Sequence, residues 1–117
     1  MQELYKIKDG SVVKFMFAKS ADDATNKYRA VFGPRGIVVT KVLTDQGYPI
    51  VRLCDVPKGT YFHRTSLRNG EFCEHSVVWC RDEYDRSTKK YLCYKFEDVN
   101  HSNQFRGEER VTIDFTF

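Results

Sequence analysis

The chain has 117 residues, a length typical of one domain. Within this domain we expect a β-α-β portion over residues 1–53 and an antiparallel β portion over residues 54–117. Apolar residues make up 41% and charged residues 30%, values that exclude an intrinsically disordered chain. No segment approaches the roughly 20 apolar residues of a membrane span, and the first ten residues lack the apolar stretch of a secretion signal. We therefore expect a cytoplasmic protein that does not bind membranes.

The first third of the sequence predicts a β-α-β unit. Residues 11–19 alternate their side chains as a strand does. Ser20 is a good N-cap for a helix, and Gly33 and Pro34 end that helix, because glycine caps helix C-termini and proline cannot continue them. Residues 36–43 form a β-branched run typical of a strand covered on both faces. One short helix does not decide whether the two strands run as a parallel crossover.

The rest of the sequence predicts an antiparallel meander, so the expected fold class is α+β. A short strand over residues 50–53 follows a turn cluster. From Thr60 onward, the Asn69-Gly70 turn signal joins two strands and places Phe62 opposite Val77. Residues 111–117, VTIDFTF, then alternate cleanly and predict a closing C-terminal strand. Its expected apolar face holds Val111, Ile113, Phe115 and Phe117.

Residues 78–96, VWCRDEYDRSTKKYLCYKF, include the tryptophan and predict a hairpin with a charged tip. A turn over residues 85–88 places Asp85 first, where its side chain accepts a backbone N–H. In this register Cys80 faces Cys93 and Trp79 faces Tyr94, because side chains alternate between the two faces of a strand. The expected apolar face then holds Val77, Trp79, Leu92, Tyr94 and Phe96.

The four cysteines are expected to be reduced thiols, because the sequence has no secretion signal. Neither C-x-x-C nor H-x-x-x-H occurs, so we expect no metal site and no cofactor. Cys80 and Cys93 are expected to be neighbouring free thiols that fill space beside each other. The alternative is a redox pair.

The chain lacks the common catalytic and phosphate-binding motifs, so we expect no enzymatic activity. G-x-G-x-x-G, G-x-x-x-x-G-K-[ST], G-x-S-x-G and H-E-x-x-H are all absent. Cys73 and His75 are two residues apart on a strand, roughly two 3.3 Å rises, which is too far for a nucleophile–base hydrogen bond. Carboxylates beside arginines at a turn are typical of a solvated surface. The alternative is a carboxylate-dependent hydrolase built on Asp82, Glu83, Asp85 and His101.

The basic and aromatic residues are separated along the sequence. Residues 1–53 carry nine Lys/Arg against five Asp/Glu, whereas eleven of the seventeen aromatic residues lie after residue 53. A single-strand binder needs its stacking side chains within its basic groove, so ordinary solvated charge is the favoured interpretation. The nucleic-acid-binding alternative uses Lys14, Lys27, Arg29, Arg35 and Lys41, with Arg86, Lys89 and Lys90 at the hairpin tip.

Three segments of the second portion carry a resemblance to known sequences. DVPKGTYF, VWCRDEYDRSTKKYLCYKFEDVN and FRGEERVTIDFTF, which together cover most of residues 55–117, resemble small uncharacterised proteins from phages and mobile elements of gut bacteria. The resemblance implies a shared origin and fold, and it brings no known activity. With no catalytic motif and many aromatic residues, we expect a small non-catalytic binding or accessory protein that acts through protein contacts. The partner and the oligomeric state stay open.

Overall fold

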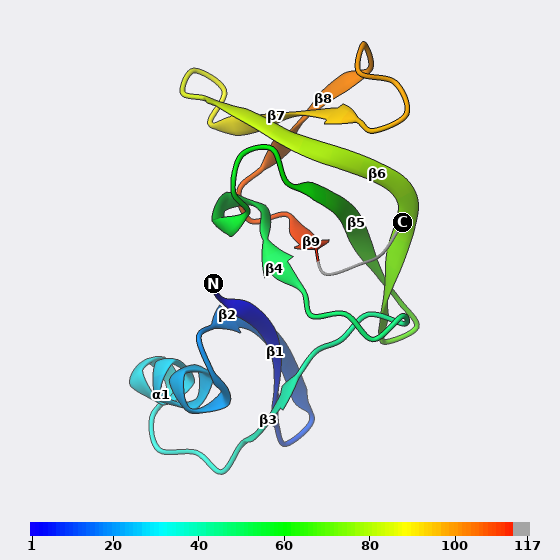
Figure 1. Cartoon of the computed structure of the whole chain (residues 1–117). Helices are drawn as coiled ribbons and strands as arrows, with labels where there is room; N and C mark the ends of the chain where they lie inside the picture. Colours follow the sequence, from blue (N-terminus) through cyan, green and yellow to red (C-terminus); the bar gives the residue numbers. More distant parts are fainter. Residues whose placement is uncertain (114–117) are drawn as a thin grey trace. The chain divides into compact units, whose positions relative to one another are not determined.

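The computed structural model describes residues 1–113 and divides into two compact units (Figure 1). Unit 1 is Met1–Val42, and unit 2 begins at Leu43, so the boundary lies earlier than the expected one after Leu53. Antiparallel strands dominate and α1 is the long helix of the described residues. The α+β prediction is therefore confirmed in its broad form, with more strand than helix.

Unit 1 is a three-stranded antiparallel sheet with a helix. Its elements are β1 Glu3–Asp9, β2 Val12–Ala18, α1 Ala21–Phe32 and β3 Val38–Lys41. β1 pairs antiparallel with both β2 and β3. β2 and β3 therefore run parallel to each other with β1 between them. The predicted β-α-β order is present, and the central strand of the sheet is β1, which was not predicted.

α1 begins and ends at the predicted residues. The Ser20 Oγ accepts a 3.1 Å hydrogen bond from Asp23 N, and Asp23 Oδ2 accepts one of 2.9 Å from Lys19 N. Gly33, with φ of 87°, caps the helix by donating its N–H to Arg29 O. Between these caps, Ala24 and Tyr28 are buried in the unit 1 core with strands β1 and β2.

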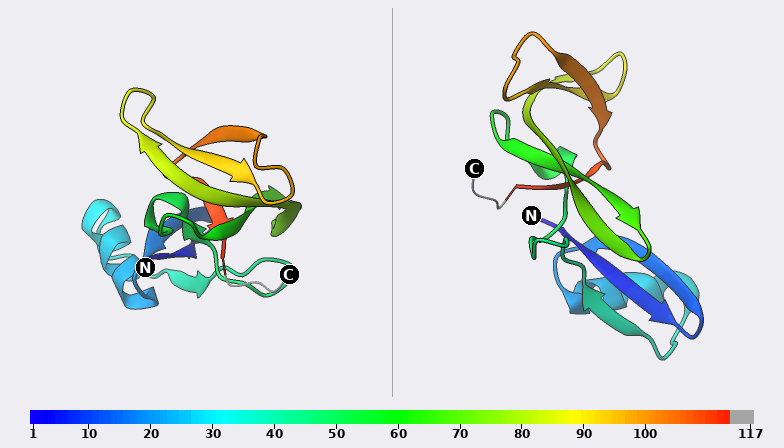
Figure 2. Two further views of the ribbon diagram at one scale, coloured as in Figure 1. Left: turned by 45° about the horizontal axis from the view of Figure 1, so that its top comes forward. Right: turned by 90° about the vertical axis from the view of Figure 1, so that its right-hand side faces the viewer.

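Unit 2 is a curled antiparallel sheet. Its elements are β4 Val51–Arg52, the 3₁₀ turn η1 Leu53–Asp55, β5 Tyr61–Arg68, β6 Glu71–Asp85, β7 Lys90–Lys95, β8 Ser102–Arg106 and β9 Arg110–Thr112. The strand order within the unit is β4-β9-β5-β6-β7-β8. β8 and β9 follow each other in the chain yet lie far apart in that order, so the sheet has to curl (Figure 2).

The curl of unit 2 encloses its core. The Trp79 and Phe105 rings meet edge to face with centroids 5.0 Å apart, and the Phe62 and Phe105 rings at 6.4 Å. Val111 from β9 is fully buried in the same cluster, and Ile113 packs against it, as the alternation of residues 111–113 predicted. The other two members of that predicted face, Phe115 and Phe117, lie outside the described residues.

The β5–β6 turn is the predicted one, but a bulge changes the pairing beyond it. Arg68 pairs with Glu71 across Asn69 and Gly70, whose φ angles of 50° and 80° suit a two-residue hairpin turn. His63 pairs with Val78, and Thr65 pairs with Glu74. Residues 75–77 of β6 therefore lie opposite the single residue 64 of β5 and form a bulge. As a result Phe62 faces Trp79 instead of Val77.

The predicted β6–β7 register is wrong. Cys80 pairs with Tyr94, and Arg81 pairs with Cys93. Asp85 accepts a hydrogen bond from Ser87 N as predicted, but the loop runs over residues 86–89 and a bulge follows it. Together these features change the register by one residue near Cys80, which moves the β7 side chains to the opposite face.

The expected common face of the hairpin therefore does not form. Trp79 packs in the core with Cys93, whereas Tyr94 and Phe96 lie on the other side of the sheet. Cys80 and Cys93 also point to opposite faces, so the geometry that suggested a redox pair is absent. Both are free thiols.

Candidate binding surfaces

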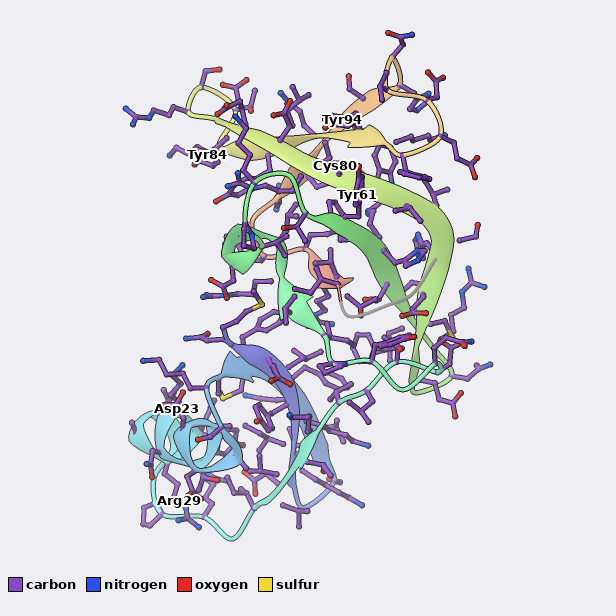
Figure 3. The ribbon with its side chains drawn as sticks, in the orientation of Figure 1. Asp23, Arg29, Tyr61, Cys80, Tyr84 and Tyr94 are labelled. Atoms are coloured by element: carbon purple, nitrogen blue, oxygen red, sulfur yellow. The ribbon has the colours of Figure 1, made fainter. Side chains whose placement is uncertain are left out.

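The outer face of unit 2 carries a row of side chains across three strands. Tyr61 of β5 pairs with Cys80 of β6, and Cys80 pairs with Tyr94 of β7. Directly paired residues share a face, and Figure 3 shows these three side chains beside one another. Phe96 N donates to Val78 O at 2.9 Å, which places Phe96 and Val78 next to this row. We call these five residues the aromatic face.

Exposure differs sharply within the aromatic face. The Cys80 side chain is only 2% exposed, whereas Tyr61 is 37% and Phe96 is 47% exposed. The Tyr61 and Phe96 rings meet edge to face with centroids 5.3 Å apart. The rings therefore cover the thiol and present apolar surface to the outside.

The Tyr94 hydroxyl is held in its neutral form. Hydrogen bonding with the Cys80 thiol is the main cause, followed by the electrostatic interaction with that side chain, and together with burial they raise the pKa of Tyr94 to about 12. Tyr94 therefore keeps its proton at physiological pH. It presents a ring together with a hydroxyl that can donate a hydrogen bond.

A polar pocket of ≈ 350 Å³ lies in unit 2 beside the bulge of β6. The segment before β4 forms one wall, because Asp45 N donates to Phe72 O at 2.9 Å and Thr44 Oγ1 donates to Glu74 Oε1 at 3.4 Å. The pocket is lined by Asp45, Gln46, Tyr48, His63, Glu74, His75 and Ser76.

The His63 ring and the Glu74 carboxyl are two of the titratable groups that line this pocket. His63 Nδ1 lies 2.7 Å from His75 O and 3.2 Å from Val77 O. Because carbonyl oxygens only accept, Nδ1 is the donor in these two contacts. Burial raises the pKa of Glu74, against the lowering effects of the His63 charge and the Thr44 hydrogen bond. No sequence pattern marks these two residues, since only the bulge and the loop bring their side chains to the same pocket.

No metal centre is formed by the part of the chain that the structure describes. Within residues 1–113, no group of three His, Cys, Asp or Glu side chains is arranged to hold a metal ion.

None of the helices within residues 1–113 combines the length and the apolarity of a membrane span.

The five predicted nucleic-acid-binding residues of the first portion all lie in unit 1 and contact their own unit. Lys27 pairs with Asp23 at 3.3 Å, Arg35 with Asp9 at 3.3 Å, and Lys41 with Glu3 at 2.9 Å. Lys14 Nζ lies 3.9 Å from the centre of the Phe32 ring. Arg29 Nε donates to Arg35 O at 3.3 Å, and Figure 3 shows Arg29 and Asp23 on α1.

The other three predicted residues lie at the end of the β6–β7 hairpin in unit 2. Arg86 and Lys89 are exposed in its loop, and Lys90 begins β7 opposite Arg106 of β8. The Tyr84 and Tyr91 rings lie at the same end of the hairpin, with centroids 4.8 Å apart. Tyrosines and cations that are close together in the sequence therefore lie at one end of the hairpin, and Arg106 joins them from β8. We call Tyr84, Arg86, Lys89, Lys90, Tyr91 and Arg106 the hairpin end.

The four residues of the hydrolase alternative fall into three different surroundings. Asp82 and Glu83 both lie near Lys58, and Glu83 pairs with it. The Asp85 carboxylate accepts from Ser87 and from Gln104, within and beside the turn. The His101 ring lies 6.1 Å from that of Trp79. Within residues 1–113 no hydrogen bond joins the four.

Comparison of the chain with protein-family models, with curated proteins and with solved structures finds no match.

Proposed function

We propose that this chain is a small non-catalytic binding protein that contacts another protein through the aromatic face of unit 2. The observation that carries the proposal is the pair Tyr61 and Phe96, 37% and 47% exposed and in edge-to-face contact on one side of a three-strand sheet. The resemblance of residues 55–117 to phage and mobile-element proteins agrees with an accessory role of this kind.

The residue types on this face favour a protein partner. Tyrosine and phenylalanine are enriched where protein interfaces are buried, and tyrosine contributes both apolar area and a hydrogen-bonding group. Tyr94 has both properties, since its hydroxyl stays protonated at neutral pH. A partner that covers Phe96 and Tyr61 removes apolar surface from water. This burial contributes about 25 cal/mol of favourable free energy for each Å² of apolar surface.

The position of the face also favours recognition by a preformed surface. Tyr61, Cys80 and Tyr94 come from three strands joined by backbone ladders, so the rings are held on a rigid element. A rigid surface loses less conformational entropy on binding than a loop does. The proposed contact therefore needs no rearrangement of unit 2.

The test compares the captured proteins of matched variants. Wild type, Phe96→Ser and Leu67→Ser are each immobilised, exposed to bacterial lysate, and the bound proteins are quantified by mass spectrometry. Leu67 is the control, because it is 46% exposed on β5 but belongs to the other end of that strand. We expect at least one protein to be retained by wild type and Leu67→Ser and reduced about tenfold or more by Phe96→Ser, as for a central interface residue. The proposal is overturned if no protein follows that pattern while all three chains are folded by circular dichroism.

A further inference from the structure

We propose that the hairpin end of unit 2 is a binding site for single-stranded nucleic acid. Proteins that bind single strands combine aromatic rings, on which bases stack, with cations that contact the phosphates. The hairpin end carries both kinds of side chain, with Tyr84 and Tyr91 on one face of the ribbon, Lys90 and Arg106 on the other, and Arg86 and Lys89 in the loop between them. The site is distinct from the aromatic face, so the inference goes beyond the proposed protein contact.

The aromatic component is a pair of tyrosines from neighbouring strands. Tyr84 and Tyr91 are directly paired across β6 and β7, with ring planes tilted by 54°. The Arg81 guanidinium lies 4.4 Å from the centre of the Tyr91 ring, an arrangement that holds this ring in place. Tyr84 is 44% exposed, and Figure 3 shows it near the hairpin tip. The exposed ring of Tyr84 is therefore the one available for base stacking.

The cationic component differs from that of unit 1 in its pairing. Within residues 1–113, none of Arg86, Lys89, Lys90 and Arg106 forms an ion pair, whereas three of the five unit 1 candidates do. Binding of phosphate therefore does not require these four cations to leave a carboxylate of the described chain. This makes them better phosphate ligands than the cations of unit 1.

The acidic residues of the hairpin are already engaged. Lys58 pairs with Glu83 and lies 4.0 Å from Asp82. The two Asp85 oxygens accept from Ser87 and Gln104, and hydrogen bonding with Ser87 lowers the pKa of Asp85. The Lys58 ammonium offsets part of the negative charge of Asp82 and Glu83, which reduces the repulsion that a phosphate would meet there, whereas Asp85 stays a carboxylate.

The shape of the site favours a single strand over a duplex. Tyr84 and Tyr91 lie on one face of the ribbon, and the Asp85–Lys90–Arg106 row lies on the other, because adjacent residues alternate faces. Arg86 and Lys89 in the loop connect the two faces. A flexible strand can stack a base on Tyr84 and carry its phosphates around the loop to Lys90 and Arg106. The bases of a duplex are already stacked inside the helix, so none of them is free to stack on Tyr84.

The experiment measures binding of the full chain to a fluorescent oligothymidine and to a duplex of equal length, by anisotropy at low salt. Two hairpin variants are used, Tyr84→Ala and the double substitution Arg86→Gln with Lys90→Gln. Tyr84→Phe keeps the ring and is the matched control for stacking. Lys27→Gln with Lys41→Gln removes the same charge from unit 1 and is the matched control for net charge.

We expect the wild-type chain to bind the single strand more tightly than the duplex. Tyr84→Ala should weaken binding about five- to hundredfold, the range of base–aromatic stacking, and Tyr84→Phe should restore it. The double hairpin variant should flatten the dependence of log K on log salt by about 0.7 per lost phosphate contact. The unit 1 variant should change binding less than twofold.

Three outcomes would overturn the proposal. The first is no binding of the oligothymidine at low salt, where phosphate contacts are strongest. The second is an equal loss in the hairpin and unit 1 double variants, which would mean that only net charge attracts the strand. The third is equal affinity of Tyr84→Ala and wild type. None of them bears on capture of a protein by the aromatic face, so the two proposals fail separately.

Discussion

Cys93 lies directly across the β6–β7 ladder from Arg81, and its thiol faces the core of unit 2 while the Cys80 thiol lies under the rings of the aromatic face. The two cysteines lie on neighbouring strands, but their side chains project from opposite faces of the sheet. Disulfide bonds need Cβ atoms about 3.5–4.5 Å apart and pointing toward each other. This pair does not satisfy that requirement.

The first prediction is that mild oxidation does not join Cys80 to Cys93 in the folded protein. Burial raises the pKa of Cys93 to about 12, so almost none of it is the reactive thiolate at pH 8. We expect iodoacetamide at that pH to leave Cys93 unmodified in the native state and to modify all four cysteines in urea. Peptide mapping by mass spectrometry gives both results. A Cys80–Cys93 disulfide recovered from folded protein would contradict the observed register.

The second prediction concerns the β5–β6 turn. Gly70 has φ of 80°, in the region that costs residues with a Cβ about 1–2 kcal/mol. Gly70→Ala should therefore lower the free energy of unfolding by about that amount. Urea denaturation should show a lower midpoint with an unchanged slope. Gly36→Ala is the control, because Gly36 lies outside the positive-φ region and an added Cβ there meets no atom within 4 Å. Equal losses in both variants would refute the argument.

Local signals predicted the turns and caps well, while the strand registers depended on features that the sequence does not show. Ser20, Gly33 and the Asn69-Gly70 pair each act through atoms of their own neighbourhood, so their roles could be read from the sequence. The bulges opposite residues 64 and 92 insert extra residues with no turn chemistry to mark them. The bulge opposite residue 92 inserts one extra residue and exchanges the two faces of β7, whereas the bulge opposite residue 64 inserts two and shifts the pairing without exchanging faces.

The missed elements have different causes. β1 carried a readable signal, because Tyr5 and Ile7 alternate with lysines and Gly10-Ser11 follows as a two-residue hairpin turn. The polar pocket carried none, since Asp45, His63 and Glu74 come together only through the loop and the bulge. The hairpin end was half predicted. Its cations are adjacent in the sequence, but Arg106 joins them only through the β7–β8 ladder.

The third prediction uses the buried carboxyl of the pocket. Burial raises the pKa of Glu74 in the folded state, so ionised Glu74 opposes folding. The native state then holds this proton more tightly than the unfolded state, and stability falls as pH rises from the ordinary glutamate pKa through the folded value. Glu74→Gln keeps the acceptor for Thr44 and carries no charge. It should be more stable than wild type at pH 7 and gain nothing at pH 4.

Thermal unfolding at the two pH values measures that difference. Glu71→Gln, at the exposed start of β6, removes the same charge without the burial and serves as the control. An equal gain for Glu74→Gln at pH 4 and pH 7 would show that the effect is not the ionisation of this carboxyl.

The last prediction concerns the contact between Tyr94 and Cys80 on the aromatic face. The Cys80 side chain is the first cause of the raised pKa of Tyr94, about 12 against an ordinary value of about 10. At pH 11 an ordinary tyrosine is mostly ionised, so Tyr94 should still be mostly protonated at that pH. Labelling the tyrosine rings with carbon-13 and following each signal by NMR separates Tyr94 from the others, with circular dichroism confirming that the chain stays folded. Cys80→Ala should lower the pKa of Tyr94 toward 10, because both the hydrogen bond and the electrostatic interaction with the Cys80 side chain are removed. Cys73→Ser, a substitution outside the Tyr61–Cys80–Tyr94 row, should leave it unchanged. If Tyr94 titrates near 12 in the Cys80→Ala variant as well, the thiol is not the cause, and the close packing of Cys80 beneath the aromatic face is wrong.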